Sequence, residues 1–283
     1  MAEILKGAPV AAAITEELIL RVEKLKAKNI VPTLAILRVG ERPDDMAYER
    51  GAMKRCEKIG IRTLSFLLPT DCEQSELMEM IADINRNDAI HGCLMFRPLP
   101  KHLDEREVCE ALCPEKDVDS MTAASLNTVF TGKGCGFPPC TAQSCIEILD
   151  YYGIDPAGKN VAVIGRSLVI GKPVSMLLQA RNATVTMCHT KTQDMPGVCS
   201  RADILVVAAG KAGVVDASYT NPGQVVIDVG INAAHDGSVC GDVQFDVVSQ
   251  HVRAITPVPA GVGSVTTAVL AKHVIEAAER VSA

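Results

Sequence analysis

Basic blocks, long apolar runs and a recognisable signal-peptide pattern are all missing from this 283-residue sequence. Its 34 acidic and 28 basic residues give a net charge of −6, which argues against a nucleic-acid or membrane-surface binder and favours a small-molecule partner. No apolar run approaches the roughly eighteen residues that a membrane-spanning helix needs. Residues 1–6 show no signal-peptide pattern. We therefore expect a cytoplasmic protein that acts on a small molecule.

Paired cysteine spacings are also missing, although the chain has eleven cysteines. They are scattered through apolar segments, as Cys56 and Cys93 are, which is typical of reduced and mostly buried thiols. The densest group, Cys135, Cys140 and Cys145, lacks the C-x2-C spacing of a zinc site. We therefore expect neither a disulfide framework nor a metal site.

Apolar and amphipathic segments alternate along nearly the whole chain, the pattern of an α/β protein with mainly parallel sheets. A chain of 283 residues is long enough for two domains. The proline-rich segment 137–141 interrupts the alternation, so we predict domains at 1–140 and 141–265, with a final helix over 266–283 that packs back on the first domain. Strands are predicted at residues 33–39, 62–67, 92–96, 160–165, 183–188, 204–209, 225–229 and 254–255, and helices at 9–28 and 142–152.

The segment 161–173 is the most informative stretch of the chain. Four apolar residues suit a strand covered on both faces, Gly165 allows a sharp turn, and Pro173 suits the first turn of the next helix. Backbone amides at such a helix N-terminus bind a pyrophosphate with the help of the helix dipole. The spacing to Gly171 is G-x5-G rather than the common G-x-G-x-x-G, and strand-to-helix turns of other α/β proteins can share it. The turn predicts a dinucleotide site.

The strand predicted at 183–188 suggests which dinucleotide is bound. It ends in His189 and Thr190 rather than in an acidic residue. An acid at this place would bind the ribose 2′-hydroxyl of NAD, whereas basic and hydroxyl side chains accommodate the 2′-phosphate of NADP. Together with Arg166, these residues favour NADP, with NAD as the other cofactor open to the chain. The alternative interpretation is that they are solvated turn residues.

Ordered motifs occur in both halves of the chain. In the second half they are G-R-S at 165–167, V-I-D-V-G-I-N at 226–232, G-D-V at 241–243 and I-T-P-V-P at 255–259. In the first half they are P-L-P at 98–100, P-E-K-D-V-D at 114–119 and P-C-T at 139–141. Together they resemble the methylenetetrahydrofolate dehydrogenase/cyclohydrolase family. The resemblance spans nearly the whole chain, which makes it far more specific than the glycine turn alone.

The resemblance implies a two-domain α/β subunit, usually a homodimer, with folate in a cleft between an N-terminal catalytic domain and a Rossmann-like NAD(P)-binding domain. Members oxidise 5,10-methylenetetrahydrofolate with NAD(P)+ in one-carbon metabolism, and bifunctional members then hydrolyse the methenyl product to 10-formyltetrahydrofolate. The catalytic residues implied here are Tyr48 and Asp119. The implied substrate-binding residues are Tyr48, Phe96, Asp119, Pro257, Gly261 and Gly263, and the implied dinucleotide-binding residues are Gly165, Arg166, Ser167, Thr190 and Ile231.

The chain departs from the family pattern around the folate site. The family has a lysine four residues after the tyrosine, where this chain has Ala52, and a serine three residues before it, where this chain has Asp45. Phe96 stands where the family has a glutamine that could orient water. The other replacements are Ser120 and Ala260 for glycines and Ser264 for a proline.

Chemistry decides which activity these departures affect. Hydride removal gives a cation delocalised over two folate nitrogens, so that step mainly needs positioning against the nicotinamide. Hydrolysis needs delivered water and proton transfers, and losing the groups that supply them costs roughly 10²–10⁴-fold. We therefore predict an NADP-linked dehydrogenase with weak or absent cyclohydrolase activity. Two alternatives stay open: a fully bifunctional enzyme that uses Arg55 or Arg97, and a catalytically silent or retargeted dinucleotide-binding relative.

Overall fold

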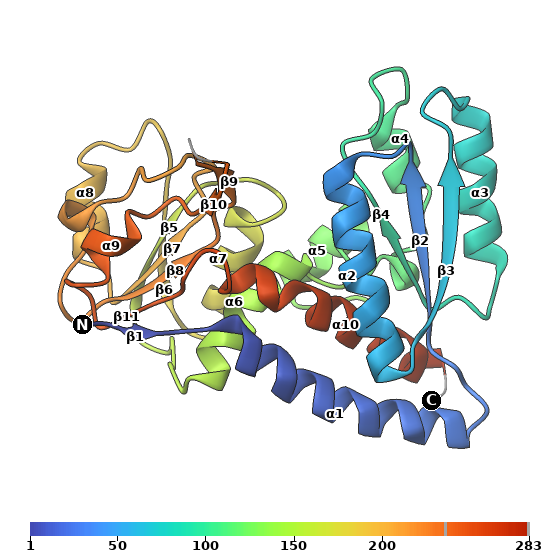
Figure 1. Ribbon diagram of the computed structural model, residues 1–283, viewed down its shortest axis with the longest axis horizontal. Coiled ribbons are helices and arrows are strands. Elements are labelled where there is room, and N and C mark those ends of the chain that lie inside the picture. The colour runs from blue at the N-terminus through green and yellow to red at the C-terminus, as the bar shows by residue number, and fades with distance from the viewer. Residues whose placement is uncertain (235–236, 282–283) are drawn as a thin grey trace. The chain divides into compact units, whose positions relative to one another are not determined.

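The computed structural model describes residues 1–234 and 237–281 (Figure 1). The chain forms two compact units. The three-stranded unit comprises Ala13–Cys140 and Thr267–Ala283, and the six-stranded unit comprises Met1–Ala12 and Thr141–Thr266. Within the described residues, no helix combines the length and the apolar composition that crossing a bilayer requires.

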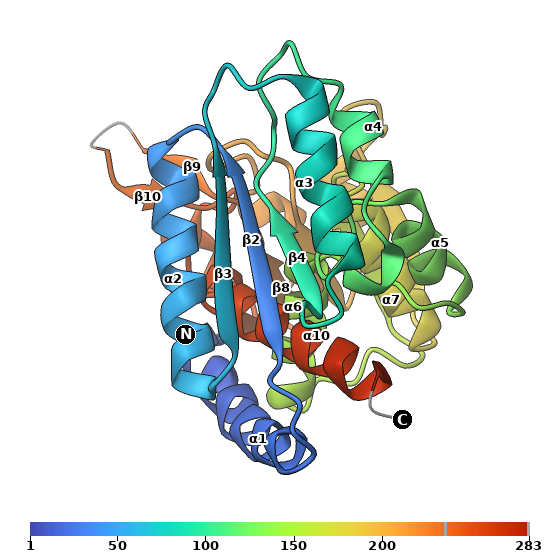
Figure 2. The same cartoon turned by 90° about the vertical axis from the view of Figure 1, so that its right-hand side faces the viewer.

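The three-stranded unit is built on a parallel sheet with the strand order β3-β2-β4 (Figure 2). The central strand β2 is buried at every residue except Arg38, as expected for a strand that is paired on both edges. The strands are β2 (Thr33–Val39), β3 (Arg62–Leu68) and β4 (Gly92–Met95), each within one residue of its predicted range. The helices are α2 (Pro43–Ile59), α3 (Gln74–Arg86), α4 (Glu105–Glu110), η1 (Pro114–Lys116) and α5 (Ala123–Thr131), with most of α1 (Gly7–Ala27) and α10 (Thr266–Val281).

Local signals set the helix ends in this unit. The helix α2 starts at Pro43, whose fixed φ suits the first helical position, and stops at Gly60, whose φ is +93°. The ammonium group of Lys116 donates to three carbonyl oxygens at the end of α3, at distances of 2.7, 2.8 and 2.9 Å. These bonds satisfy groups that a helix C-terminus leaves without partners, and they tie η1 to α3.

The C-terminal helix α10 packs within the three-stranded unit. The imidazole of His273 stacks on the Phe137 ring at a centroid distance of 4.9 Å, and the guanidinium of Arg280 lies 4.1 Å from the same ring centre. Its first residue, Thr266, agrees with the predicted range 266–283, and residues 282 and 283 lie outside the described part of the chain.

The six-stranded unit is built on a parallel sheet with the strand order β1-β11-β8-β7-β5-β6. All residues of β7 and β8 are buried, as the continuous apolar runs predict for strands covered on both faces. The strands are β1 (Glu3–Ile4), β5 (Asn160–Ile164), β6 (Thr184–Cys188), β7 (Ile204–Val207), β8 (Val225–Asp228) and β11 (Ala254–Ile255), with a separate antiparallel hairpin of β9 (Asn232–Ala233) and β10 (Val239–Cys240). The helices are α6 (Cys140–Tyr151), α7 (Gly171–Ala180), α8 (Met195–Ser200), η2 (Ala217–Tyr219), α9 (Phe245–Val248) and η3 (Val262–Ser264).

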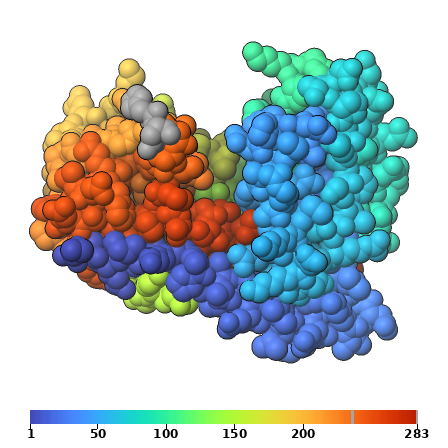
Figure 3. Space-filling view, viewed as in Figure 1, coloured from blue at the N-terminus to red at the C-terminus, as the bar shows by residue number. Residues whose placement is uncertain are grey.

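The strand β1 is the main difference from the predicted elements. Glu3 pairs with Ala254 and Ile4 with Ile255, so the N-terminus adds an edge strand to the six-stranded sheet. Figure 3 shows the darkest blue residues of the N-terminus in contact with orange residues of this unit. The predicted range 1–140 placed these residues in the other domain, because two residues are too few to show an alternating pattern.

Candidate functional site

The carboxyl edge of the six-stranded sheet contains a topological switch point. The strand β5 lies between β6 and β7, so the chain leaves β5 toward one side and later returns to its other side. Ligands of open α/β sheets bind where the strand order reverses in this way. Gly165 follows β5 with a φ of +116°, and a Cβ there would lie 2.2 Å from the carbonyl oxygen of Ala208, which follows β7. Glycine at 165 therefore allows the two strand ends to approach closely.

The turn from β5 to α7 needs its second glycine for the same reason. A Cβ at Gly171 would lie 2.2 Å from the carbonyl oxygen of Gly165. The turn closes through Ser167, whose carbonyl accepts the Lys172 N–H at 3.0 Å and whose hydroxyl accepts the Ile170 N–H at 3.1 Å. The side chains of Arg166 and Ser167 are exposed beside this turn. The G-x5-G spacing thus produces a compact turn that leads into the first turn of a ten-residue helix.

The end of β6 lies at the same edge. Its last residue, Cys188, accepts the Gly165 N–H through its carbonyl at 2.9 Å. His189 is fixed in a turn, because its N–H donates to the Thr192 hydroxyl at 2.9 Å and its Nδ1 accepts the Lys191 N–H at 3.1 Å. Thr190 is exposed. The structure therefore brings four predicted dinucleotide-binding residues to one edge of the sheet: Gly165, Arg166, Ser167 and Thr190.

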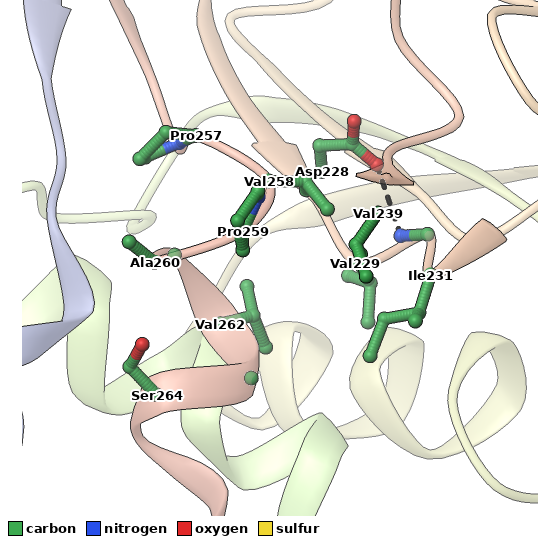
Figure 4. Close-up of a pocket in the computed structure, with 13 residues that line it drawn as sticks. Asp228, Val229, Ile231, Val239, Pro257, Val258, Pro259, Ala260, Val262 and Ser264 are labelled. Carbon is green, nitrogen blue, oxygen red and sulfur yellow. Dashed lines mark hydrogen bonds between the residues drawn. The ribbon is translucent and has the colours of Figure 1, made fainter. Parts of the chain in front are cut away.

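A mostly apolar cavity of about 160 Å³ opens at the carboxyl ends of β8 and β11 (Figure 4). Pro259, Val262 and Ile231 turn their side chains toward the same space. Since ligand pockets typically enclose roughly 300–1,000 Å³, this cavity has room for part of a ligand, such as one ring. Four predicted site residues line it: Ile231, Pro257, Gly261 and Gly263.

The loop around this cavity contains one of the replaced glycine positions. Ala260 has a φ of +78°, a conformation that disfavours every residue with a Cβ. The neighbouring Gly261 packs so closely that a Cβ there would lie 2.3 Å from the Pro257 carbonyl oxygen. A glycine at 260 would adopt this positive φ without strain, which gives a physical reason for the glycine of the family pattern at this position.

Two buried aspartates beside the cavity were not among the predicted site residues. Asp228 ends β8 and Asp242 follows β10, and they are 3% and 0% exposed. Burial raises the pKa of Asp228 to about 6; hydrogen bonds from three backbone N–H groups oppose the rise, and the charge of Asp242 adds to it. Both residues occur in motifs that carry the family resemblance, but neither motif showed what the carboxylates contact.

The predicted folate residues lie in the three-stranded unit. Tyr48, on α2, meets Phe96 edge to face, with ring centroids 6.0 Å apart and an interplanar angle of 80°. Ala52, one turn after Tyr48, is 1% exposed. The carboxylate of Asp45 is buried and lies 3.5 Å from Nε of Arg42. The charge of Asp45 is therefore paired with Arg42, the residue immediately before α2.

Asp119 follows η1 and is held by the start of α6. Its Oδ1 accepts the Cys140 N–H at 2.8 Å. Burial raises the pKa of Asp119, while the hydrogen bonds from Cys140 and the charge of Arg97 oppose the rise. The next residue, Ser120, has a φ of +57°, and its buried hydroxyl contacts no hydrogen-bonding partner among the described residues. Both replaced glycines, at 120 and 260, thus stand at left-handed positions.

The two arginines proposed as substitutes for the lysine differ in their surroundings. Arg55 donates to the Thr15 hydroxyl of α1 at 2.9 Å, which directs its guanidinium to that helix. The positive charge of Arg97 lowers the pKa of both Cys109 and Asp119, against the rise that burial causes. Among the described residues, no three His, Cys, Asp or Glu side chains are grouped to hold a metal ion.

Family models for two domains match the chain. The model of the tetrahydrofolate dehydrogenase/cyclohydrolase catalytic domain matches residues 5–119, and that of the NAD(P)-binding domain matches residues 139–282. The chain belongs to the tetrahydrofolate dehydrogenase/cyclohydrolase family. This confirms the resemblance inferred from the motifs.

Relatives of this family member match along its whole length. The "Bifunctional protein FolD" of Carboxydothermus hydrogenoformans is 55% identical over 281 residues, covering 99% of this chain and 98% of the relative. The crystal structure of the bifunctional FolD from Campylobacter jejuni matches with a TM-score of 0.95 at 36% identity, covering 99% of each chain. The Trypanosoma brucei FolD, complexed with NADP cofactor and inhibitor, matches with a TM-score of 0.92 at 34% identity, covering 99% of this chain and 98% of that chain. The predicted two-domain α/β fold is confirmed.

Proposed function

We propose that this protein oxidises 5,10-methylenetetrahydrofolate to 5,10-methenyltetrahydrofolate with NADP+ in one-carbon metabolism. The observation that carries the proposal is the Gly165 to Gly171 turn, which lies at the switch point of a sheet that the NAD(P)-binding family model matches. The Trypanosoma brucei relative, whose structure contains NADP, supports the choice of cofactor. Oxidation of the methylene group requires a hydride acceptor, and NADP+ supplies it when bound.

The residues at the sheet edge fit this dinucleotide. The start of α7 offers backbone N–H groups and the positive end of a helix dipole to a pyrophosphate. Gly165 and Ser167 shape that turn, and the exposed Arg166 and Thr190 bind the 2′-phosphate. The cavity lined by Ile231 and residues 257–264 receives the nicotinamide ring, because its volume suits one ring and its walls are mostly apolar.

The three-stranded unit supplies folate contacts in this proposal, in addition to those predicted for Pro257, Gly261 and Gly263. Asp119, whose pKa is raised by burial, hydrogen-bonds the pterin, and its bond from Cys140 holds the carboxylate in place. Tyr48 and Phe96 present an aromatic surface to the substrate. Hydride transfer requires mainly that the methylene carbon be held against the nicotinamide, so none of these residues needs to act as a base in this step.

We propose further that hydrolysis of the methenyl product is slow. The family lysine is replaced by Ala52, which is 1% exposed, and the glutamine is replaced by Phe96, whose ring contacts Tyr48. Neither side chain can deliver water or transfer a proton. The second candidate is a fully bifunctional enzyme, which the similarity to the bifunctional FolD protein of Carboxydothermus hydrogenoformans favours. In that case Arg97, which acts on Asp119, is a better substitute cation than Arg55, which is bound to Thr15.

One spectrophotometric experiment tests both statements. Purified protein is given 5,10-methylenetetrahydrofolate with NADP+ or NAD+, and the reduced nicotinamide and the methenyl compound are followed together. Hydrolysis is then measured separately from added methenyltetrahydrofolate. We expect NADPH formation and accumulation of the methenyl compound. Equal rates for the two steps would favour the bifunctional enzyme, and no reduction of either cofactor would favour the silent or retargeted alternative.

We also propose that the enzyme is a cytoplasmic homodimer. The proposal rests on the family resemblance and on a composition without a long apolar run. Light scattering coupled to size-exclusion chromatography would test the dimer, and a mass of one 30.1 kDa chain would contradict it. Cell fractionation would test the location.

A further inference from the structure

The buried carboxylates of Asp228 and Asp242 have no part in the function proposed above. They lie at the carboxyl edge of the six-stranded sheet, beside the cavity. Burying a charge is costly unless it is fully hydrogen-bonded, so each carboxylate has to be matched by a set of donors. The identity of those donors indicates what the two residues do.

Asp242 is surrounded by four hydrogen-bond donors. Its Oδ2 accepts the N–H groups of Ala209 and Gly210 at 2.7 and 2.9 Å. Its Oδ1 accepts the N–H of Lys211 at 2.8 Å and the side-chain amide of Asn232 at 2.9 Å. Three consecutive amides that point at one anion form an anion-binding nest. In this protein the anion is a side chain of the chain itself.

Asp228 holds Asp242 from the other side. Its carboxylate accepts the backbone N–H groups of Gly230, Asp242 and Val243 at 2.9, 3.1 and 3.0 Å. Its own N–H donates to the Thr256 hydroxyl at 2.8 Å, immediately before the cavity loop. A continuous set of hydrogen bonds therefore joins Thr256, β8, the segment after β10 and the loop after β7.

The loop after β7 lies at the switch point. Ala208 begins this loop, and its carbonyl oxygen occupies the space that a Cβ at Gly165 would need. A shift of the loop would therefore change the shape of the dinucleotide turn. The nest also occupies the three amides of residues 209–211, so they are directed at Asp242 rather than at a ligand.

We propose that Asp242 is a positioning residue for the dinucleotide, which fixes the loop 208–211 at the switch point, and that Asp228 fixes Asp242 in turn. This inference rests on the proposed function, because it requires the dinucleotide to bind at that edge. It assigns no contact between Asp242 and the cofactor. It predicts that weakening the nest reduces affinity for NADP+ while leaving affinity for folate unchanged.

The variant Asp242→Asn tests the nest with almost no change in volume. An asparagine has one acceptor oxygen, so whichever way it is oriented, its NH2 group faces two of the four donors. The exchange Asn232→Asp combined with Asp242→Asn restores an acceptor opposite the new NH2 group. Asn232→Ala removes a single donor. Asp203→Asn is a control for the same substitution elsewhere in the sheet, because the exposed Asp203 accepts one backbone N–H, that of Asn160 at 2.8 Å, at the amino ends of the strands.

Isothermal titration calorimetry with NADP+ and, separately, with tetrahydrofolate gives the readout. We expect the NADP+ Kd of Asp242→Asn to rise at least about tenfold, because two buried donors lose their acceptor, with the folate Kd within about twofold of wild type. The exchange variant should recover part of the loss. Asp203→Asn should leave the NADP+ Kd unchanged, because an asparagine oxygen can still accept its one N–H.

Several outcomes would overturn the inference. One is an NADP+ Kd of Asp242→Asn within about twofold of wild type, and another is an equal loss of folate affinity. If Asp242→Asn does not fold, the variant Asn232→Ala is used instead. A threefold or larger rise in its NADP+ Kd, about 0.6 kcal/mol, supports the inference. An unchanged Kd overturns it. Wild-type protein that binds neither NADP+ nor NAD+ would overturn the proposed function itself, whereas normal wild-type binding with unchanged variants would overturn only this inference.

Discussion

Restoring the family lysine and glutamine should create hydrolysis only when both are present. Position 52 lies one helical turn after Tyr48, so a lysine there would share the face of α2 that carries the tyrosine. The Phe96 ring, 6.0 Å from the Tyr48 ring, occupies the space beside that tyrosine. We therefore expect Ala52→Lys alone to change little, because its ammonium group meets a ring where water is needed.

The magnitude follows from the chemistry and the burial. General acid–base catalysis is worth roughly 10²–10⁴-fold. Ala52 is 1% exposed, and burial lowers the pKa of a lysine toward neutrality, where it serves as an acid or base. We expect the double variant Ala52→Lys with Phe96→Gln to raise the hydrolysis rate by at least about 10²-fold, and each single variant by less than about tenfold.

The assay compares methenyltetrahydrofolate hydrolysis with NADPH formation for the same protein preparation. Dehydrogenase activity controls for folding and for folate binding. Met53→Lys is the matched control, because it adds the same side chain to the same helix at a position that is 37% exposed. Full rescue by Ala52→Lys alone would remove Phe96 from the reasoning. Rapid hydrolysis by the unchanged protein would refute the reasoning as a whole.

Three further predictions concern stability. Ser120→Gly should raise the free energy of unfolding by about 1 kcal/mol, since it relieves a φ of +57°. Lys116→Met should lower it by about 2–4 kcal/mol, since the ammonium group donates to the carbonyl oxygens of Ile84, Asn85 and Asn87. Asp228, whose pKa is raised to about 6, binds a proton more tightly in the folded state than in the unfolded state. Its contribution to stability should therefore fall by about 2–3 kcal/mol as the pH rises from 4 to 7.

Urea unfolding checks all three, with the pH series repeated for Asp228→Asn to isolate that group. A loss of stability in Ser120→Gly would show that the serine side chain contributes more than its backbone strain costs. If Lys116→Met changes the free energy of unfolding by less than about 0.5 kcal/mol, the three hydrogen bonds of this ammonium group contribute no more than an ordinary surface ion pair. A wild-type stability that rises with pH relative to Asp228→Asn would contradict the sign derived above.

The sheets and the dinucleotide turn could be predicted because their signals are local. The apolar runs of β5, β7 and β8 are continuous, and a strand covered on both faces requires such runs. Gly165 and Gly171 could be assigned to a tight turn for the same reason, and the structure shows the close approach that each permits. The strand β1 could not be predicted, because its partner β11 lies at the other end of the sequence. The strands β9 and β10 pair with each other, but two residues in each are too few to show an alternating pattern.

The residues of the candidate site also differ in how far the sequence could predict them. Ile231 and Gly263 could be grouped only through the family motifs, since 32 positions separate them, yet they line one cavity. Asp242 could not be assigned a role, because its donors include the backbone of residues 209–211, and no spacing in sequence shows which amides meet a carboxylate. The side chain of Arg55 shows the same limit, because its contact with Thr15 on α1 depends on how two helices pack.

The departures from the family pattern around Tyr48 remove groups that hydrolysis needs and that hydride transfer does not need. The family lysine and glutamine that are replaced at positions 52 and 96 would act on water or on a proton. The dinucleotide half keeps its turn and both aspartates of the hydrogen-bonded set, although two residues that line its cavity, Ala260 and Ser264, are replaced. Hydride transfer depends on that half for orientation of the nicotinamide. The proposal of slow hydrolysis therefore predicts that this chain oxidises its substrate faster than it hydrolyses the product, and the ratio of the two rates tests it.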